Sequence, residues 1–270
     1  MREPLHFVHG NGFPSPCYHQ LLSRLEERYN CYYIERVGHD HRFPVSENWR
    51  ALVDEVILSI QSKTTQPVIA VGHSLGGILS LLASIEQPAL FKSVILLDSP
   101  LLGRFKSSIL RLSKMLGVID HVTPAFRTRS RRHHWQTREE AFSYLKSRKL
   151  FKHFTPACLN DYIEYGLNKE ESGYTLRFDP GIEYQIYRTI PHVLHRYEGA
   201  LSVPCALIYG NKSNVINPAD IQYMKTHHQI VSFKANGSHM FPMEHPAVVA
   251  DLIFHAVGEL EAKEEMIGYT

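Results

Sequence analysis

Short apolar runs of strand length alternate along this chain with longer segments whose apolar residues recur at helical spacing. Such alternation, with strands that are apolar throughout, predicts a mostly parallel sheet with helices on both faces. Helices are expected at 16–28, 47–62, 76–87 and 246–260. The strand-like runs are LHFVHG (5–10), CYYIERV (31–37), PVIAVGHS (67–74), SVILLDS (93–99), PCALIYG (204–210) and IVSFKA (230–235).

The block between the fourth and fifth runs breaks this alternation and contains no convincing strand–helix–strand unit. We therefore expect an α/β core formed by residues 1–100 and 196–270, with a helical cap of residues 101–195 inserted after the strand that ends at Asp98. Within the cap, amphipathic patterns predict helices at 109–119, 138–151 and 159–168, and an extended piece with a turn at 173–180.

Composition limits the class of partner. A chain of 270 residues suits one α/β domain with an insertion. The net charge of +2 gives no argument for a nucleic-acid or membrane partner. Its four cysteines are widely spaced, without a metal-binding pattern, and no apolar signal or membrane-spanning segment stands out. We expect a cytoplasmic protein with reduced thiols and no membrane or nucleic-acid partner, while the oligomeric state is left open.

The motif GHSLGG (72–77) lies where a strand-like run meets a predicted helix. In open parallel sheets, ligands bind beyond the carboxyl ends of the strands, so this junction is at the expected binding edge. A serine in a G-x-S-x-G turn is strained and projects its hydroxyl outward, and the small residues around it let strand and helix pack closely. Ser74 is therefore predicted to be a nucleophile.

Two further motifs complete a plausible acyl-transfer site. HGNG (9–12) ends the first run, and such a loop, together with the residue after the nucleophile, can supply backbone N–H groups to an oxyanion; this points to Asn11 and Leu75. His239 follows the last run and is the predicted general base, with His245 as the alternative.

With GHSLGG, HGNG and a late GSH in this order, the chain resembles the α/β-hydrolase superfamily, in particular its capped serine esterases. The resemblance covers nearly the whole chain. It implies an eight-stranded sheet with a cap after strand six, and it implies no metal or organic cofactor. Because the first run here matches strand three of that sheet, the first two strands are expected to be missing or short.

The position of the catalytic acid departs from the usual pattern. Where relatives commonly read Gly-x-x-Asp, residues 210–213 read Gly-Asn-Lys-Ser, and the neutral Ser213 cannot stabilise an imidazolium as a carboxylate does. Asp98 ends the strand after the nucleophile strand, and some members of the superfamily place their acid there. We therefore predict Asp98 as the acid, with Asp220, Glu244 or no acid at all as alternatives.

These residues predict a serine hydrolase that cleaves small-molecule carboxylic esters or thioesters through an acyl-enzyme on Ser74. A carbon–carbon bond hydrolase or an amidase remains possible. So does a ligand-binding or regulatory protein that keeps the fold with little turnover, a hypothesis that the neutral Ser213 favours. The basic run RTRSRRHHW (127–135) is either a solvated helix end or an attractor for an anionic substrate.

Overall fold

The core of the protein is a six-stranded sheet in which every neighbouring pair of strands is parallel. The computed structural model describes residues 2–129 and 131–268. Each of the six apolar runs supplies one strand, so the predicted sheet is confirmed. In spatial order the strands are β2 (Asn30–Tyr33), β1 (Pro4–Val8), β3 (Val68–His73), β4 (Phe91–Leu97), β8 (Cys205–Gly210) and β9 (Val231–Ala235).

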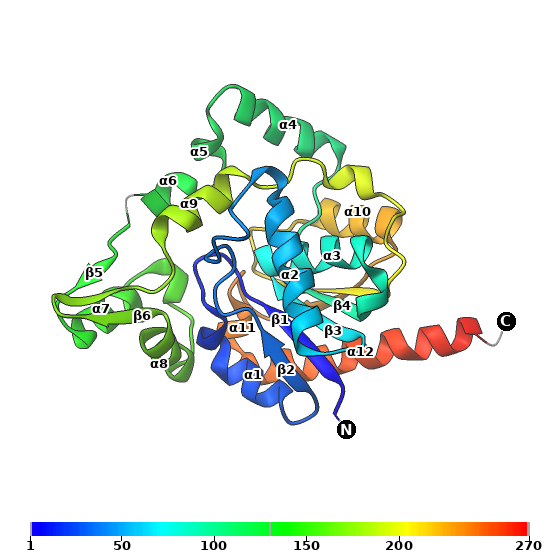
Figure 1. Cartoon of the computed structure of the whole chain (residues 1–270), viewed down its shortest axis with the longest axis horizontal. Coiled ribbons are helices and arrows are strands. Elements are labelled where there is room, and N and C mark those ends of the chain that lie inside the picture. Colours follow the sequence, from blue (N-terminus) through cyan, green and yellow to red (C-terminus); the bar gives the residue numbers. More distant parts are fainter. Residues whose placement is uncertain (1, 130, 269–270) are drawn as a thin grey trace.

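Helices cover both faces of this sheet, as the alternation predicts (Figure 1). On one face, α1 (His19–Leu25) and α12 (Pro246–Gly268) bury their apolar residues against strand residues such as Phe7. On the other face, the strands pack against α2 (Arg50–Lys63), α3 (Leu75–Glu86) and α10 (Pro218–His228). The alternate residues of each strand thus enter two separate hydrophobic clusters.

The six strands match the last six of the eight that the resemblance implies. Within the described residues, β1 is the first strand along the chain. None of the described helices is both long and apolar enough to cross a membrane.

The segment between β4 and β8, called here the insertion (residues 101–195), mixes helices with a small antiparallel sheet of order β5-β7-β6. The sheet was not predicted as such, although the extended piece at 173–180 is confirmed as β7. The strands are β5 (His134–Trp135), β6 (Leu167–Glu170) and β7 (Gly173–Leu176). The helices are α4 (Arg104–Met115), α5 (Ile119–Val122), α6 (Ala125–Arg129), α7 (Arg138–Lys146), α8 (Pro156–Tyr165) and α9 (Pro180–Arg188).

Each helix predicted in the insertion overlaps an observed helix, but each prediction extends too far at its carboxyl end. The helix predicted at 159–168 stops at Tyr165, because Leu167 and Asn168 pair with β7 in a hairpin. The helix predicted at 109–119 stops at Met115, and Gly117 then turns the chain with a φ of 71°. Short elements elsewhere are α11 (Phe241–Glu244) and the 3-10 turns Ser15–Tyr18, Glu47–Trp49, Pro88–Leu90, Lys149–Phe151 and Leu194–Tyr197.

Close packing of α3 on β1 gives a test of the fold. A Cβ on Gly76 would lie 2.0 Å from the carbonyl oxygen of Val8, a backbone atom that cannot easily move. We expect Gly76→Ala to lower the free energy of unfolding by about 3 kcal/mol or more, measured by urea denaturation. Gly258→Ala in α12 is the control: a Cβ there meets nothing within 4 Å, so better helix propensity should stabilise by roughly 0.5–1 kcal/mol. Equal effects of the two changes would contradict this packing.

Candidate active site

Ser74 lies on a strained turn between β3 and α3, with a φ of 53° and a ψ of −113°. Its N–H donates to the carbonyl of Leu97 at 2.9 Å, which fixes the turn against β4. A Cβ on Gly72 would come within 2.4 Å of the backbone of Gly76, and one on Gly77 within 2.2 Å of the Ser99 Oγ. The expectation that these small residues permit close packing around Ser74 is confirmed.

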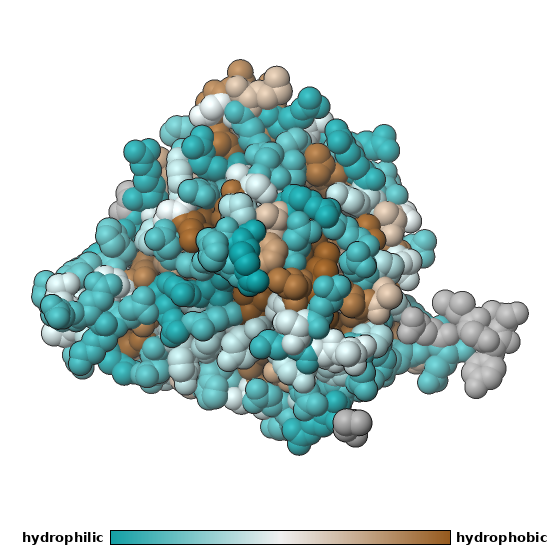
Figure 2. All heavy atoms as spheres, in the orientation of Figure 1, coloured by the Kyte–Doolittle hydropathy of each residue, from teal (hydrophilic) through white to brown (hydrophobic). Residues whose placement is uncertain are grey.

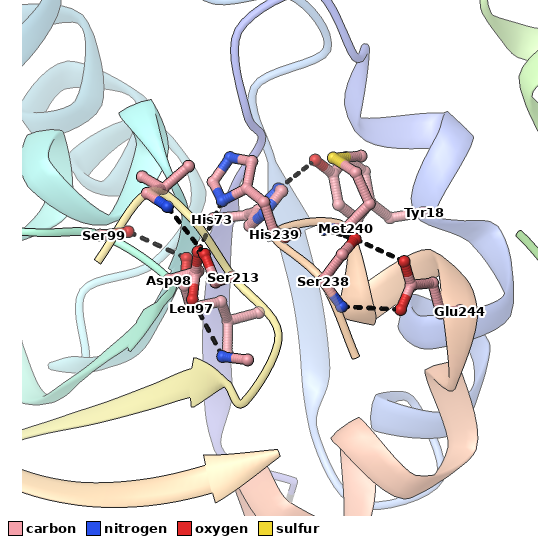
Figure 3. Close-up of polar contacts among 12 residues, drawn as sticks. Tyr18, His73, Leu97, Asp98, Ser99, Ser213, Ser238, His239, Met240 and Glu244 are labelled. Carbon is pink, nitrogen blue, oxygen red and sulfur yellow. Dashed lines mark hydrogen bonds and ion pairs between the residues drawn. The ribbon is translucent and has the colours of Figure 1, made fainter. Parts of the chain in front are cut away.

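Asp98 and His239 are in direct contact. Asp98 is fully buried at the end of β4, and its Oδ2 lies 2.7 Å from the Nδ1 of His239, which comes from the loop after β9 (Figure 3). A carboxylate acceptor fixes the proton on Nδ1 and so leaves Nε2 as the nitrogen that can accept a proton.

Ser213 occupies the position where relatives commonly have an acid, and its hydroxyl donates a hydrogen bond to Asp98. Its Oγ donates to the Asp98 Oδ2 at 2.5 Å, while the Gly210 N–H donates to Oδ1 at 2.9 Å. The Asp98 carboxylate therefore accepts three hydrogen bonds from the ends of β8 and β9. A second carboxylate at position 213 would face the first one at close range and repel it.

The alternative acids have other partners. Asp220 caps α10 through Asn217 and forms an ion pair with Lys106 at 2.6 and 2.7 Å. Glu244 accepts the N–H of Ser238 at 2.9 Å and its hydroxyl at 2.5 Å, so it holds the loop that carries the histidine (Figure 3). Among the acids considered, Asp98 is the one that the described contacts join to His239.

His245, the alternative base, lies between α11 and α12. Its backbone N–H donates to Phe241, and its carbonyl accepts from Val249. Its side chain lines the same cavity as Ser74, but within the described residues no hydrogen bond joins it to a carboxylate. His239 is therefore the better placed of the two.

The loop with the predicted oxyanion donors is held by the insertion. The Asn11 side chain donates to the Glu183 carbonyl of α9 at 3.0 Å, and a Cβ on Gly12, whose φ is 81°, would lie 2.8 Å from the Glu183 Oε1. Leu75 is the first residue of α3, and the first N–H groups of a helix have no partner inside it. Asn11, Leu75, Ser74 and His239 all line one cavity.

A buried chain of hydrogen bonds connects the loop that carries His239 with the loop that follows β1 at Gly10. Sequence reasoning did not predict it. Burial and, second, the neighbouring His239 lower the pKa of His73 to about 3, so its ring is neutral. We assign its Nε2–H as donor to the carbonyl of His239 at 3.0 Å, and its Nδ1 as acceptor from the Tyr18 hydroxyl at 2.7 Å. The Tyr18 oxygen in turn accepts the Gly10 N–H at 3.1 Å. His73 stood in the motif, but nothing local in the sequence pointed to Tyr18.

The cavity has a volume of about 1850 Å³ and lies between the carboxyl edge of the sheet and the insertion. The aromatic residues of the insertion that line it are Trp135, Tyr144, Phe151, Tyr162 and Tyr187. Within the described residues the Ser74 hydroxyl donates no hydrogen bond to the protein. The hydroxyl therefore has no competing acceptor among the described residues, and it lines a cavity large enough for a sizeable substrate.

Positive charge dominates the cavity wall. Two glutamates line it, and both have partners: Glu183 pairs with Arg131 at 2.6 Å, and Glu244 binds Ser238. Burial raises the pKa of Glu183, and the Arg131 charge opposes that rise. Within the described part of the chain, no carboxylate pairs with five of the cations that line the cavity. They are Arg127, Arg148, Lys149, Lys152 and Lys212.

A parallel sheet whose carboxyl edge carries a serine on a strained strand-to-helix turn is the architecture of the α/β hydrolases. Residues 7–252 match the model of the alpha/beta hydrolase family, and the chain therefore belongs to that family. The match supports hydrolase activity without fixing the bond that is cleaved.

Solved structures of similar fold include E-2-(acetamidomethylene)succinate hydrolase, with 19% identity and a TM-score of 0.77 over 95% of this chain and 91% of that one. A thioesterase domain from the curacin biosynthetic pathway shows 19% identity and a TM-score of 0.72 over 94% and 91%. An esterase of M. tuberculosis shows 14% identity and a TM-score of 0.70 over 95% and 86%. No curated protein matches the chain. At such low identities these likenesses show the fold alone.

Buried neutral histidines make stability depend on pH. Burial lowers the pKa of His6 and His73 to about 3 and that of His9 to about 4, from 6.5. As pH falls from about 6.5 to about 4, the unfolded chain binds protons that the folded chain does not, so stability decreases by up to about 1.4 kcal/mol per pH unit for each histidine. Urea denaturation at several pH values measures this slope. His6→Gln should lower this slope by up to about 1.4 kcal/mol per pH unit, the share of one histidine; an unchanged slope in the variant would contradict the prediction.

Proposed function

We propose that this protein is a serine hydrolase that cleaves carboxylic esters or thioesters. The observation that carries the proposal is the 2.7 Å contact between the buried Asp98 and His239, at the cavity that Ser74 also lines. In this proposal Ser74 is the nucleophile, His239 the general base and Asp98 the acid that orients the ring.

The reaction would proceed in two displacement steps. His239 takes the Ser74 proton as Oγ attacks the substrate carbonyl, and the N–H groups of Asn11 and Leu75 stabilise the oxyanion. His239 then gives the proton to the departing alcohol or thiol, which leaves an acyl-enzyme. A water that loses its proton to His239 attacks this ester, and the released Ser74 oxygen regains the proton as the carboxylic acid departs.

Esters and thioesters have good leaving groups and so demand the least of the general acid His239, whereas a triad of this kind also cleaves amides. Amides and carbon–carbon bonds have poorer leaving groups and demand more of that acid. Neighbours in fold include both a thioesterase and a hydrolase of E-2-(acetamidomethylene)succinate, so fold alone does not select the bond. A panel of esters, thioesters and amides with one shared acyl group would rank the classes.

A binding protein without turnover is the competing hypothesis, and it rested on the neutral Ser213. The Ser213 hydroxyl donates to Asp98, which removes the feature that favoured it. A fluorophosphonate probe separates the two hypotheses, because an activated serine attacks its phosphorus and displaces fluoride, which leaves a stable phosphonate ester on the serine. We expect labelling that disappears in Ser74→Ala, whereas an unlabelled wild type would support the binding protein.

The acid assignment has a direct test. Asp98→Asn should lower kcat/KM for p-nitrophenyl butyrate by roughly 10³–10⁴-fold, because the ring loses its oriented charge partner. Circular dichroism checks that the variant is folded. Adding Ser213→Asp to that variant returns a carboxylate to the neighbouring turn and should recover about tenfold or more. An active wild type with an unaffected Asp98→Asn would show instead a serine–histidine dyad or another acid.

The unpaired cations predict a preference for substrates with a negative charge away from the scissile bond. Monoethyl adipate and ethyl hexanoate have six-carbon acyl chains and differ by one terminal carboxylate. We expect the adipate to have the lower KM, and the double variant Arg148→Gln, Lys152→Gln to raise KM for the adipate alone by roughly 3–10-fold. A pH-stat follows both reactions. An unchanged ratio of the two KM values would assign these cations to a solvated rim.

A further inference from the structure

Helix α4 packs against the protein by the face opposite to its apolar stripe. Phe105, Ile109, Leu112 and Leu116 follow helical spacing and are 79%, 45%, 54% and 66% exposed. Ser107, Leu110 and Ser113, on the other side, are buried. An amphipathic helix of a globular protein normally turns its apolar stripe inward, so this orientation is reversed.

The exposed apolar surface continues past the end of the helix. We call it the α4–α5 patch; its residues are Phe105, Ile109, Leu112, Met115, Leu116, Val118 and Val122. In Figure 2, apolar side chains gather at the top of the molecule, where Figure 1 places α4 and the turn toward α5. Eight of the fourteen exposed large apolar residues of the described chain lie between positions 105 and 126. Such concentration marks an interaction surface.

Ion pairs hold the helix in this orientation. Lys114 lies against Glu47, Lys106 against the buried Asp220 at 2.6 Å, and Arg104 against Glu198 at 3.2 Å. These three cations of α4 thus anchor its polar side to the core. The apolar side faces solvent.

Positive charge is concentrated around the patch, and three of its cations lack a carboxylate partner within the described residues. Residues 101–129 contain six lysines and arginines and one acid, Asp120, which already binds Arg188 at 3.2 Å. Within the described residues, no carboxylate pairs with Arg111, Arg127 or Arg129. The expectation of no membrane partner rested on the net charge of +2 for the whole chain. That total does not reveal the local excess of positive charge in residues 101–129.

The patch also reaches the cavity. Ile109 and Val122 belong to the patch and line the same space as Ser74. Arg127 lines it as well. A molecule bound at the patch would therefore be adjacent to the cavity opening.

We propose that the α4–α5 patch docks on an anionic lipid surface. Its apolar side chains would enter the boundary between headgroups and acyl chains, and Arg111, Arg127 and Arg129 would face the phosphates. A second copy of the chain fits less well, because a self-complementary contact would bring these unpaired arginines of both copies together without acids to balance them. The proposal goes beyond the hydrolase activity, since docking requires no turnover.

Vesicle flotation with the full chain tests the proposal. Vesicles of phosphatidylcholine with about 30 mol% phosphatidylglycerol should float the protein, neutral vesicles much less, and about 0.5 M NaCl should weaken the binding. Leu112→Glu should lower the bound fraction at least about tenfold. Val248→Glu is the matched control, since Val248 is 56% exposed on α12, away from the patch, and this variant should bind like the wild type. Ser74→Ala should also bind, which separates this result from any failure of the catalytic proposal.

Three outcomes would overturn the proposal. The first is a wild type that does not float with anionic vesicles, and the second is an equal loss of binding in Leu112→Glu and Val248→Glu. The third outcome is concentration-dependent self-association in sedimentation velocity that Leu112→Glu abolishes, without any vesicle binding; the patch would then be a contact between copies.

Discussion

The buried carboxylate of Asp98 is the interaction on which the carboxyl edge of the sheet depends. A fully buried charge is costly unless each lone pair finds a donor. Here the donors are the Gly210 N–H at the end of β8, the Ser213 hydroxyl in the turn that follows it, and the His239 ring in the loop after β9. One side chain at the end of β4 therefore fixes two loops at once. This arrangement explains the neutral residue at position 213, because Ser213 supplies a hydrogen-bond donor to the Asp98 carboxylate.

The insertion lines the cavity and also holds the loop at Asn11 and Gly12 in place. Glu183 of α9, paired with Arg131, lies against Gly12, while the Asn11 side chain bonds the carbonyl of the same glutamate. Because that pair is largely shielded from water, its attraction is screened less than that of a surface pair. Loss of either partner would leave an unpaired charge beside the proposed oxyanion donors. Shape at the site thus depends on residues more than 100 positions away in sequence.

Sequence reasoning reached those features that have a local signal. Periodicity gave the strands and the covering helices, and the glycines of GHSLGG gave the sharp turn, because a Cβ at these positions would collide with backbone. The helix predicted at 159–168 extends beyond the observed end at Tyr165, because hairpin pairing with β7 overrides local helix propensity. Sequence reasoning reached Asp98 through chain position and resemblance. Contacts such as that between Tyr18 and His73 arise only when distant segments pack, and no spacing rule reports them.

Two neighbouring residues at the edge of the sheet share an unusual backbone conformation. Ser74 and Asp98 both follow strands directly, and their φ angles are 53° and 48°. Each such residue costs on the order of 1–3 kcal/mol, and persists only where surrounding structure fixes it. Here the sheet does so: the Ser74 N–H bonds the carbonyl of Leu97, and the Asp98 N–H bonds that of Ile208, both at 2.9 Å. The strand ladder continues through both strained residues. The nucleophile and the acid of the proposed triad are therefore positioned by β3, β4 and β8 rather than by flexible loops, which leaves His239 as the member carried on a loop.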